Sequence, residues 1–247
     1  MNAETRKKLV MDYYENYAET YGEEYETTIA GRYFLKRKLN LALKMGGFKK
    51  NDHILDAGCA NAPFSLALAQ RGFKVTGIDL AQNNIVVCRR RAKQLGLAGA
   101  DFCVADLENL KDFRESQFDG VLSFAALRYV PDLNGALREL YRVTKKGGRV
   151  VVDFPNKHSP WFLFCQRFAR RYVLPHDKEC DLYYARKDSI ELMRSVGFRD
   201  VEAKVDLFIA RTTPNYLAPP FIVLDQLLSH MPLVQKMGGA ILLKGMK

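Results

Sequence analysis

Short apolar runs alternate with amphipathic stretches through most of the chain, and this alternation predicts the fold. Apolar runs between turn signals are typical of buried strands, whereas apolar positions repeating every three or four residues are typical of helices. The predicted strands begin near His53 and then cover residues 74–79, 101–105, 118–124, 149–154, 201–209 and 240–244. The predicted helices cover most of residues 1–47 and then 62–70, 81–95, 134–144, 188–196 and a segment that starts at Pro219. This order indicates an α/β fold whose mostly parallel sheet has helices on both faces.

Two stretches interrupt the alternation and suggest how the chain is organised. A length of 247 residues suits one large α/β domain with additions. We expect an N-terminal helical cap over residues 1–47 and a main domain over 48–247. Insertions at 155–186 and 210–238 then follow the fifth and sixth strands.

The chain is organised around the sequence from His53 to Pro63, which predicts a strand, a tight turn and a helix N-terminus. Such a turn points free N–H groups at a ligand. A dinucleotide fingerprint G-x-G-x-x-G read from Gly58 fails at Pro63. Asp56 would also repel a pyrophosphate. A ligand with a positive centre, an amine and a carboxylate fits better, and S-adenosylmethionine has these groups.

Two further acids follow predicted strands. Asp79 ends the second strand, 23 residues after Asp56, and Asp106 follows the third. A ribose-binding acid is expected roughly 20 residues beyond such a turn. With Gly58 leading the turn, these acids resemble the motifs of the class I S-adenosylmethionine-dependent methyltransferases. The resemblance is strong over about residues 48–155.

The resemblance implies a Rossmann-like, seven-stranded, mostly parallel sheet with an antiparallel last strand. It also implies S-adenosylmethionine as cofactor and S-adenosylhomocysteine as product. Asp79 would bind the ribose and Asp106 the adenine edge. The full set of expected cofactor-binding residues is Tyr21, Asp56, Gly58, Ala60, Asn61, Asp79, Leu80, Asp106, Leu107 and Phe124.

The glycine loop departs from the usual D-x-G-x-G-x-G at its second and third glycines, which are Ala60 and Ala62. Alanine tolerates negative φ but not the wider range open to glycine. A non-catalytic module that binds a cofactor or partner therefore remains an alternative. Asn61 is the expected N-cap of the following helix.

Tyrosines recur in the predicted N-terminal helices at spacings of 3, 4 and 4, namely Tyr14, Tyr17, Tyr21 and Tyr25. This spacing places them on one helix face, where most would pack onto the domain. In the resembling family a tyrosine on such a helix often closes over the cofactor. Tyr21 or Tyr17 is the candidate, because an aromatic face favours a sulfonium.

Methyl transfer by in-line displacement depends mainly on positioning, and it needs a base only if the nucleophile loses a proton. The candidate bases are His158 and His176, both in the first insertion, with Tyr129 and Tyr183 as further options. His53 starts the first strand, away from the ligand-binding edge of the sheet. No metal site is expected.

Composition widens the range of partners without deciding between them. The net charge of +10 permits an anionic membrane surface, which Arg167, Arg170 and Arg171 could contact. Arg89–Arg91 are expected on a solvated helix face. Aromatic and aliphatic residues in both insertions favour a small, apolar or lipid-like acceptor.

The alternative is methylation of tRNA or protein. The Asn/Asp-Pro-Pro-Tyr motif of many amino-methylating relatives is absent, since Ser123–Ala126 stands there, and nucleic acid is disfavoured. Five cysteines without metal-ligand spacing, no signal-peptide pattern and no membrane-spanning run suggest a cytoplasmic protein. The sequence predicts no oligomeric state.

Overall fold

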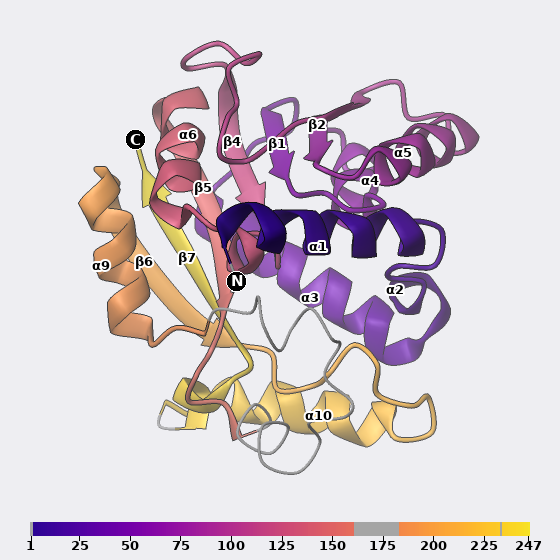
Figure 1. Cartoon of the computed structure of the whole chain (residues 1–247). Coiled ribbons are helices and arrows are strands. Elements are labelled where there is room, and N and C mark those ends of the chain that lie inside the picture. Colours follow the sequence, from indigo (N-terminus) through magenta and orange to yellow (C-terminus); the bar gives the residue numbers. More distant parts are fainter. Residues whose placement is uncertain (1, 161–182, 233) are drawn as a thin grey trace.

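Figure 1 shows a computed structural model of the chain, which describes residues 2–160, 183–232 and 234–247. The helices before the first strand are α1 (Ala3–Tyr17), α2 (Glu24–Thr27) and α3 (Ile29–Gly46). The strands are β1 (His53–Ala57), β2 (Lys74–Asp79), β3 (Ala100–Val104), β4 (Phe118–Ser123), β5 (Thr144–Pro155), β6 (Arg199–Asp206) and β7 (Ala240–Met246). The later helices are α4 (Pro63–Ala69), α5 (Gln82–Gln94), α6 (Leu133–Val143), α9 (Arg186–Val196) and α10 (Ala218–Leu228), with 3₁₀ helices η1 (Leu127–Tyr129) and η3 (Val234–Met237).

The strands form one sheet in the order β3-β2-β1-β4-β5-β7-β6. Pairing is parallel from β3 through β5, whereas β7 runs antiparallel to both β5 and β6. The predicted Rossmann-like fold class, including the antiparallel last strand, is thereby confirmed. The strand order reverses between β1 and β4, and ligands of such sheets bind beyond the carboxyl ends of the strands at this point.

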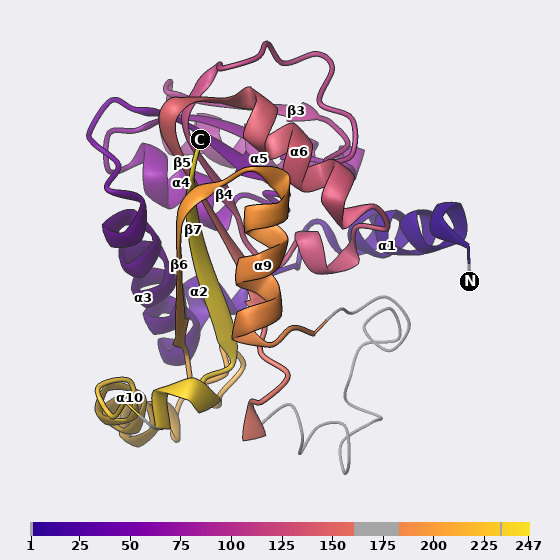
Figure 2. The ribbon, with the colours of Figure 1, turned by 90° about the vertical axis from the view of Figure 1, so that its left-hand side faces the viewer.

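Helices cover both faces of the sheet because the buried strands are apolar on both sides (Figure 2). Leu55 of β1 packs into a cluster with Leu137 of α6 and Met193 of α9. Its neighbour Ile54 packs into a second cluster with Leu39 of α3 and Leu68 of α4. Consecutive residues of one strand thus contribute to opposite layers of the core.

Strand β5 begins earlier than predicted. The predicted strand starts at residue 149, whereas β5 begins at Thr144, directly after α6, so residues 145–148 form an added segment of the strand. The register shifts between Phe118 and Gly120, opposite this segment, which is a β-bulge. Lys145 binds Asp119 at 2.6 Å and does not lie beside the last carbonyls of the helix. The helix ends within one residue of its predicted end, and tertiary pairing extends the strand back to that point.

Helix α1 crosses the carboxyl ends of the central strands, and α10 lies along the edge of the molecule beside α3 (Figure 1). Within the described residues, no helix has the length and apolar character that crossing a membrane requires. Of the first predicted insertion only the two ends fall within the described residues. The second insertion contains α10 and η3.

Candidate functional site

The loop between β1 and α4 brings the backbone close to the centre of the site. Gly58 has φ +84°, and a Cβ at this position would lie 2.3 Å from the Cβ of Ala126. Ala60 and Ala62 have φ of 47° and 69°. Both alanines thus adopt the left-handed conformation, which costs an L-residue about 1–2 kcal/mol. The expectation that alanine would restrict this loop is wrong for these two positions.

The carboxylate of Asp79 at the end of β2 holds the loop in this conformation. It accepts hydrogen bonds from the backbone N–H of Ala60 at 2.8 Å and of Ala81 at 3.0 Å. The side-chain amide of Asn84 donates a third at 3.1 Å. Burial raises the pKa of Asp79, and these three donors act in the opposite direction. A carboxylate has about four acceptor positions, so Asp79 keeps one for a ligand.

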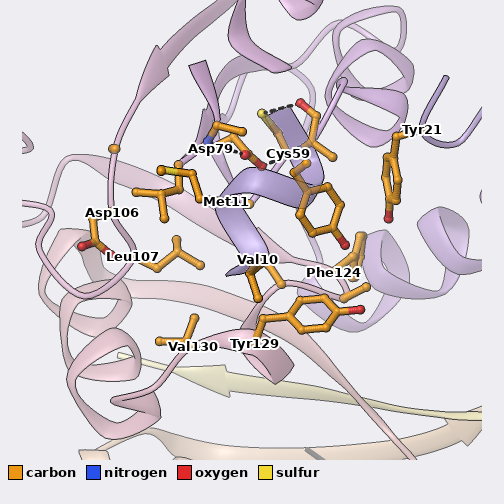
Figure 3. A pocket seen from close by; sticks show the side chains of 18 of the residues that line it. Val10, Met11, Tyr21, Cys59, Asp79, Asp106, Leu107, Phe124, Tyr129 and Val130 are labelled. Carbon is orange, nitrogen blue, oxygen red and sulfur yellow. Dashed lines mark hydrogen bonds between the residues drawn. The ribbon is translucent and has the colours of Figure 1, made fainter. Parts of the chain in front are cut away.

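A pocket of about 950 Å³, including its open mouth, lies at the point where the strand order reverses (Figure 3). This volume is in the range of small-molecule and cofactor sites. Eight of the ten predicted cofactor-binding residues line it: Tyr21, Gly58, Ala60, Asp79, Leu80, Asp106, Leu107 and Phe124. Figure 3 shows Asp106 and Leu107 at one end and Phe124 and Tyr21 at the other.

The remaining two predicted residues, Asp56 and Asn61, do not line this pocket. Asp56 is buried, and its carboxylate accepts a hydrogen bond from the Ser65 hydroxyl at 2.5 Å. Burial raises the pKa of Asp56 to about 6. The side-chain amide of Asn61 donates to the backbone carbonyls of Ala18 and Tyr21. Asn61 therefore ties the N-terminal segment to the loop, and both side chains take supporting positions.

Asn61 is also not the N-cap of α4. The N-cap position is Ala62, whose side chain makes no capping hydrogen bond. Pro63 at the start of the helix needs no partner for a backbone N–H. The helix therefore begins without the side-chain cap that the sequence suggested.

Of the two predicted catalytic histidines, His158 does not line the described pocket. His158 is exposed and only its backbone N–H is bonded, to the side-chain oxygen of Asn156 at 3.1 Å. His176 lies outside the described residues. Tyr129, the alternative base from η1, does line the pocket, with its ring edge-on to Tyr14. His53 binds Thr76 at 2.9 Å at the opposite end of β1, as expected from its position.

Lys38 of α3 also lines the pocket, although it was not among the residues predicted from the sequence. Its side chain is almost fully buried and its ammonium binds the carboxylate of Asp153 on β5 at 2.6 Å. Nζ also lies 4.7 Å from the ring centroid of Phe124. The only sequence signal was a lysine on the apolar face that Leu39 and Ala42 define. Lys38 places an ammonium group, paired with Asp153, at the end of the pocket opposite Asp106.

The tyrosines do not share one continuous helix face, because α1 ends at Tyr17. Tyr17 is exposed and stacks on Tyr13, whereas Tyr21 and Tyr25 line the pocket. Of the two candidates for closing over a cofactor, only Tyr21 is in place. The turn between α1 and α2 therefore decides which rings face the pocket.

Arg211, after β6, holds these tyrosines in place. Its guanidinium donates to the hydroxyl of Tyr25 at 2.9 Å and of Tyr21 at 3.4 Å. It also pairs with Glu24 at 2.7 Å. Arg211 therefore links the second insertion to the pocket wall.

Ion pairs and helix-end contacts fasten α1 and α2 over the pocket. Lys7 pairs with Asp106 and Glu108, so the expected adenine-binding acid is already in contact with α1. The carboxylate of Glu15 accepts from the first N–H groups of α5 at 2.6 and 2.9 Å. An acid at a helix N-terminus is favourable for the helix dipole.

The arginines at residues 89–91 are more than a solvated face. Arg90 pairs with Glu19, and Arg91 pairs with Glu26. Arg91 also donates to the backbone carbonyl of Asn61 at 2.7 Å. Helix α5 thus contributes to holding the cap, which its amphipathic pattern alone did not indicate.

A family profile described as a methyltransferase domain matches residues 48–172, about half of the chain. The chain belongs to this methyltransferase family. Its match begins just before β1 and includes the loop at Gly58 and the acid Asp79.

Known relatives agree with this membership. The ubiquinone biosynthesis O-methyltransferase of Pseudomonas paraeruginosa is 34% identical over 121 residues, 49% of this chain. The match spans about half (51%) of that relative's length. An S-adenosylmethionine-dependent methyltransferase of Thermotoga maritima, described as a possible histamine N-methyltransferase, has 18% identity and a TM-score of 0.69. The similarity covers 96% of this chain and 99% of that one.

A third similarity is to phosphoethanolamine N-methyltransferase 2 of Haemonchus contortus, solved with S-adenosylhomocysteine. It has 18% identity and a TM-score of 0.63, covering 85% of this chain and 52% of that one. At these identities the solved structures establish that the methyltransferase fold is shared.

Proposed function

We propose that this methyltransferase-family chain uses S-adenosylmethionine to methylate a small, apolar or lipid-like acceptor by in-line displacement. The observation that carries the proposal is the charge arrangement of the pocket. Asp79 and Asp106 line one part, and Lys38 lines the end beside Phe124. A zwitterionic cofactor with hydroxyl donors at one end and a carboxylate at the other matches this arrangement.

The pocket residues fit the parts of that cofactor. The free acceptor position of Asp79 suits a ribose hydroxyl, and Asp106 with Leu107 suits the polar edge and the face of an adenine ring. Gly58 leaves room for close approach to the backbone. Lys38 suits the methionine carboxylate, and Phe124 and Tyr21 suit a sulfonium by cation–π attraction.

When bound, the cofactor supplies an electrophilic methyl group. The chain's own contribution is to bind, orient and exclude water, and in well-oriented systems orientation alone lowers a barrier by about 7–11 kcal/mol. Helix α1, fastened through Lys7 and Glu15, covers the pocket for this purpose. Tyr129 lines the pocket and is our candidate base for an acceptor that must lose a proton.

The acceptor class follows from the pocket lining and from the relatives. Much of the wall is apolar or aromatic, including Val10, Met11, Val130 and Tyr14. The relative named for ubiquinone biosynthesis is consistent with a quinone-like or other lipid-like acceptor. The division into an N-terminal cap and a methyltransferase core, with insertions shaping the acceptor side, belongs to the same proposal.

The proposal extends to partners and location. Peripheral contact with an anionic membrane surface was predicted from Arg167, Arg170 and Arg171, which lie outside the described residues. The net charge of +10 supports such contact. A cytoplasmic location is supported by the free thiols of Cys59, Cys88 and Cys103.

The non-catalytic alternative rested on Ala60 and Ala62. Because both adopt left-handed conformations, the loop follows a backbone path that glycine would also take at these positions. This alternative therefore loses the observation that favoured it, and no contact in the site favours methylation of tRNA or protein.

Calorimetric titration with S-adenosylmethionine and S-adenosylhomocysteine tests the cofactor half of the proposal. We expect Lys38→Gln to weaken binding by about tenfold or more, because a charge-assisted hydrogen bond contributes about 1.5–3 kcal/mol. Lys36→Gln, on the exposed face of the same helix, is the matched control and should bind normally. If neither compound binds to the wild-type protein, the proposal is refuted.

Methyl transfer to hydroquinone-like phenols with isoprenoid tails tests the acceptor half. Turnover of the tailed phenols above that of untailed ones would support an apolar acceptor. Equal turnover of both, or transfer only to polar amines, would contradict it.

A further inference from the structure

Helix α10 turns its one charged residue toward the protein, together with Ala218 and Ile222, and turns most of its large apolar side chains outward. Its only charged residue, Asp225, is 1% exposed. The Asp225 carboxylate accepts hydrogen bonds from the Tyr33 hydroxyl at 2.6 Å and from the backbone N–H groups of Phe208 at 2.6 Å and Ile209 at 3.2 Å. It also pairs with Arg37 at 3.1 Å. These bonds fix the helix about its own axis.

The outward side consists of large apolar side chains. We call Phe221, Val223, Leu224, Leu227 and Met231 the α10 apolar face; they are 45–60% exposed. These residues are exposed and do not line the described pocket.

Rotation of the helix cannot bury this face without breaking the Asp225 contacts. An unpaired buried hydrogen-bonding group costs about 1–3 kcal/mol, and here several would be left at once. The apolar face is therefore held outward by the structure, and contiguous exposed apolar side chains of this kind mark an interaction site.

The charged residues near the α10 apolar face indicate what kind of partner it binds. From Leu207 to Met237 the only acid is the buried Asp225, whereas Arg211 before α10 and Lys236 after it are basic. On the neighbouring helix α3, Arg32 and Lys36 are exposed beside the residues that bind Asp225. An apolar strip with cationic surroundings and no exposed acid of its own suits an anionic lipid surface.

The size of the face favours lipid over a second copy of the chain. Helix α10 has 11 residues and is therefore about 16 Å long. One side of such a helix is much smaller than the roughly 800 Å² per partner of a standard protein interface. A lipid surface needs no such area, because a few inserted side chains together with basic residues suffice for reversible binding.

We propose that the α10 apolar face docks this protein on an anionic membrane surface. This inference deepens the proposed membrane contact and rests on it, but it does not depend on methyl transfer. The segment between β6 and α10 contains Arg211, which bonds to the pocket residues Tyr21 and Tyr25. Because β6 ends at the edge of the sheet where the pocket lies, docking would bring a lipid-like acceptor near the pocket.

Vesicle flotation tests the docking directly, using phosphatidylcholine alone and phosphatidylcholine mixed with phosphatidylglycerol. We expect the wild-type protein to bind the mixed vesicles, and less so as salt is raised. The double variant Val223→Glu/Leu227→Glu changes the two most exposed positions of the face and should bind at least about tenfold less.

The matched control is Val86→Glu/Leu95→Glu, on α5 and at its C-cap, where both side chains are 51% exposed. It adds the same charge at comparable exposure and should float as the wild type does. Unchanged flotation of the α10 variant, an equal loss in the control, or equal binding to neutral vesicles would overturn the proposal.

Sedimentation of the wild-type protein without lipid tests whether a second copy of the chain covers the face instead. Self-association that the α10 variant abolishes would show that a second copy covers the face, which also overturns the proposal. Calorimetry with S-adenosylhomocysteine on the same variants keeps the two proposals apart. Normal cofactor binding without flotation would refute the docking and leave the proposed enzyme intact.

Discussion

Replacing Asp79 with asparagine removes one negative charge and keeps the size of the side chain. In the native protein one carboxylate oxygen accepts from Ala60 N–H at 2.8 Å, and the other accepts from Ala81 N–H and the Asn84 amide. Asparagine can keep the oxygen that faces Ala81 and Asn84. Its NH₂ group then faces the N–H of Ala60, where two donors meet.

The substitution has two separate effects, one on stability and one on cofactor affinity. An unpaired backbone N–H at Ala60 costs about 1–3 kcal/mol of the free energy of unfolding, which lowers Tm by about 2–12 °C for a chain of this size. The lost charge also weakens the hydrogen bond to a cofactor hydroxyl by about 1.5–3 kcal/mol. The Kd for S-adenosylhomocysteine should therefore rise by about 10- to 150-fold.

Calorimetry and a thermal melt of the same preparation measure both effects. Asp101→Asn on β3 is the control, because this exposed acid lies outside the pocket on the neighbouring strand. A folded Asp79→Asn protein whose Kd stays within about twofold of the wild type would contradict the ribose-binding role. A loss of Tm with unchanged Kd would assign Asp79 to the loop alone.

Two further predictions concern buried carboxylates. Burial raises the pKa of Asp56 to about 6 in the folded state. The folded protein therefore binds this proton more tightly than the unfolded chain, and stability should fall as pH rises from about 4 to about 6. Between these pH values, the free energy of unfolding from urea titrations should fall by about 2–3 kcal/mol less in Asp56→Asn than in the wild type. An Asp56→Asn protein with the same dependence of stability on pH as the wild type would contradict this. Asp225→Ala should cost about 3–6 kcal/mol because it leaves the Tyr33 hydroxyl and two backbone N–H groups unpaired. Hydrogen exchange should then be faster in α10 than in α6, and equal protection of both helices would refute this.

Several features were predictable because short segments of the chain encode them. The strands at His53, residues 74–79 and 118–124 follow from apolar runs bounded by turn residues, and their ends differ from prediction by one residue or so. The loop at Gly58 follows from a small residue between an apolar strand and a helix. Asp79 was found because its position at a strand end depends on spacing along the chain.

The errors arose where a local signal competed with a distant contact. Asn61 has the chemistry of an N-cap, but its amide is used by the carbonyls of Ala18 and Tyr21 in the N-terminal segment. The basic residues at 89–91 have the pattern of a solvated face, yet Arg90 and Arg91 bind acids of the cap. In each case the partner is forty or more residues away and leaves no trace in the local pattern.

The amino-acid sequence by itself determined the order of strands and helices, the turn at Gly58 and the acid that supports it, because periodicity and turn chemistry act over a few residues. Only the tertiary structure decided that Lys38 and Asp153, 115 residues apart, meet in the pocket. It also decided that α10 faces outward with its apolar side. The helix pattern defines an apolar and a polar side, but burial of Asp225 depends on Tyr33 and Arg37 of α3, which the fold brings to it.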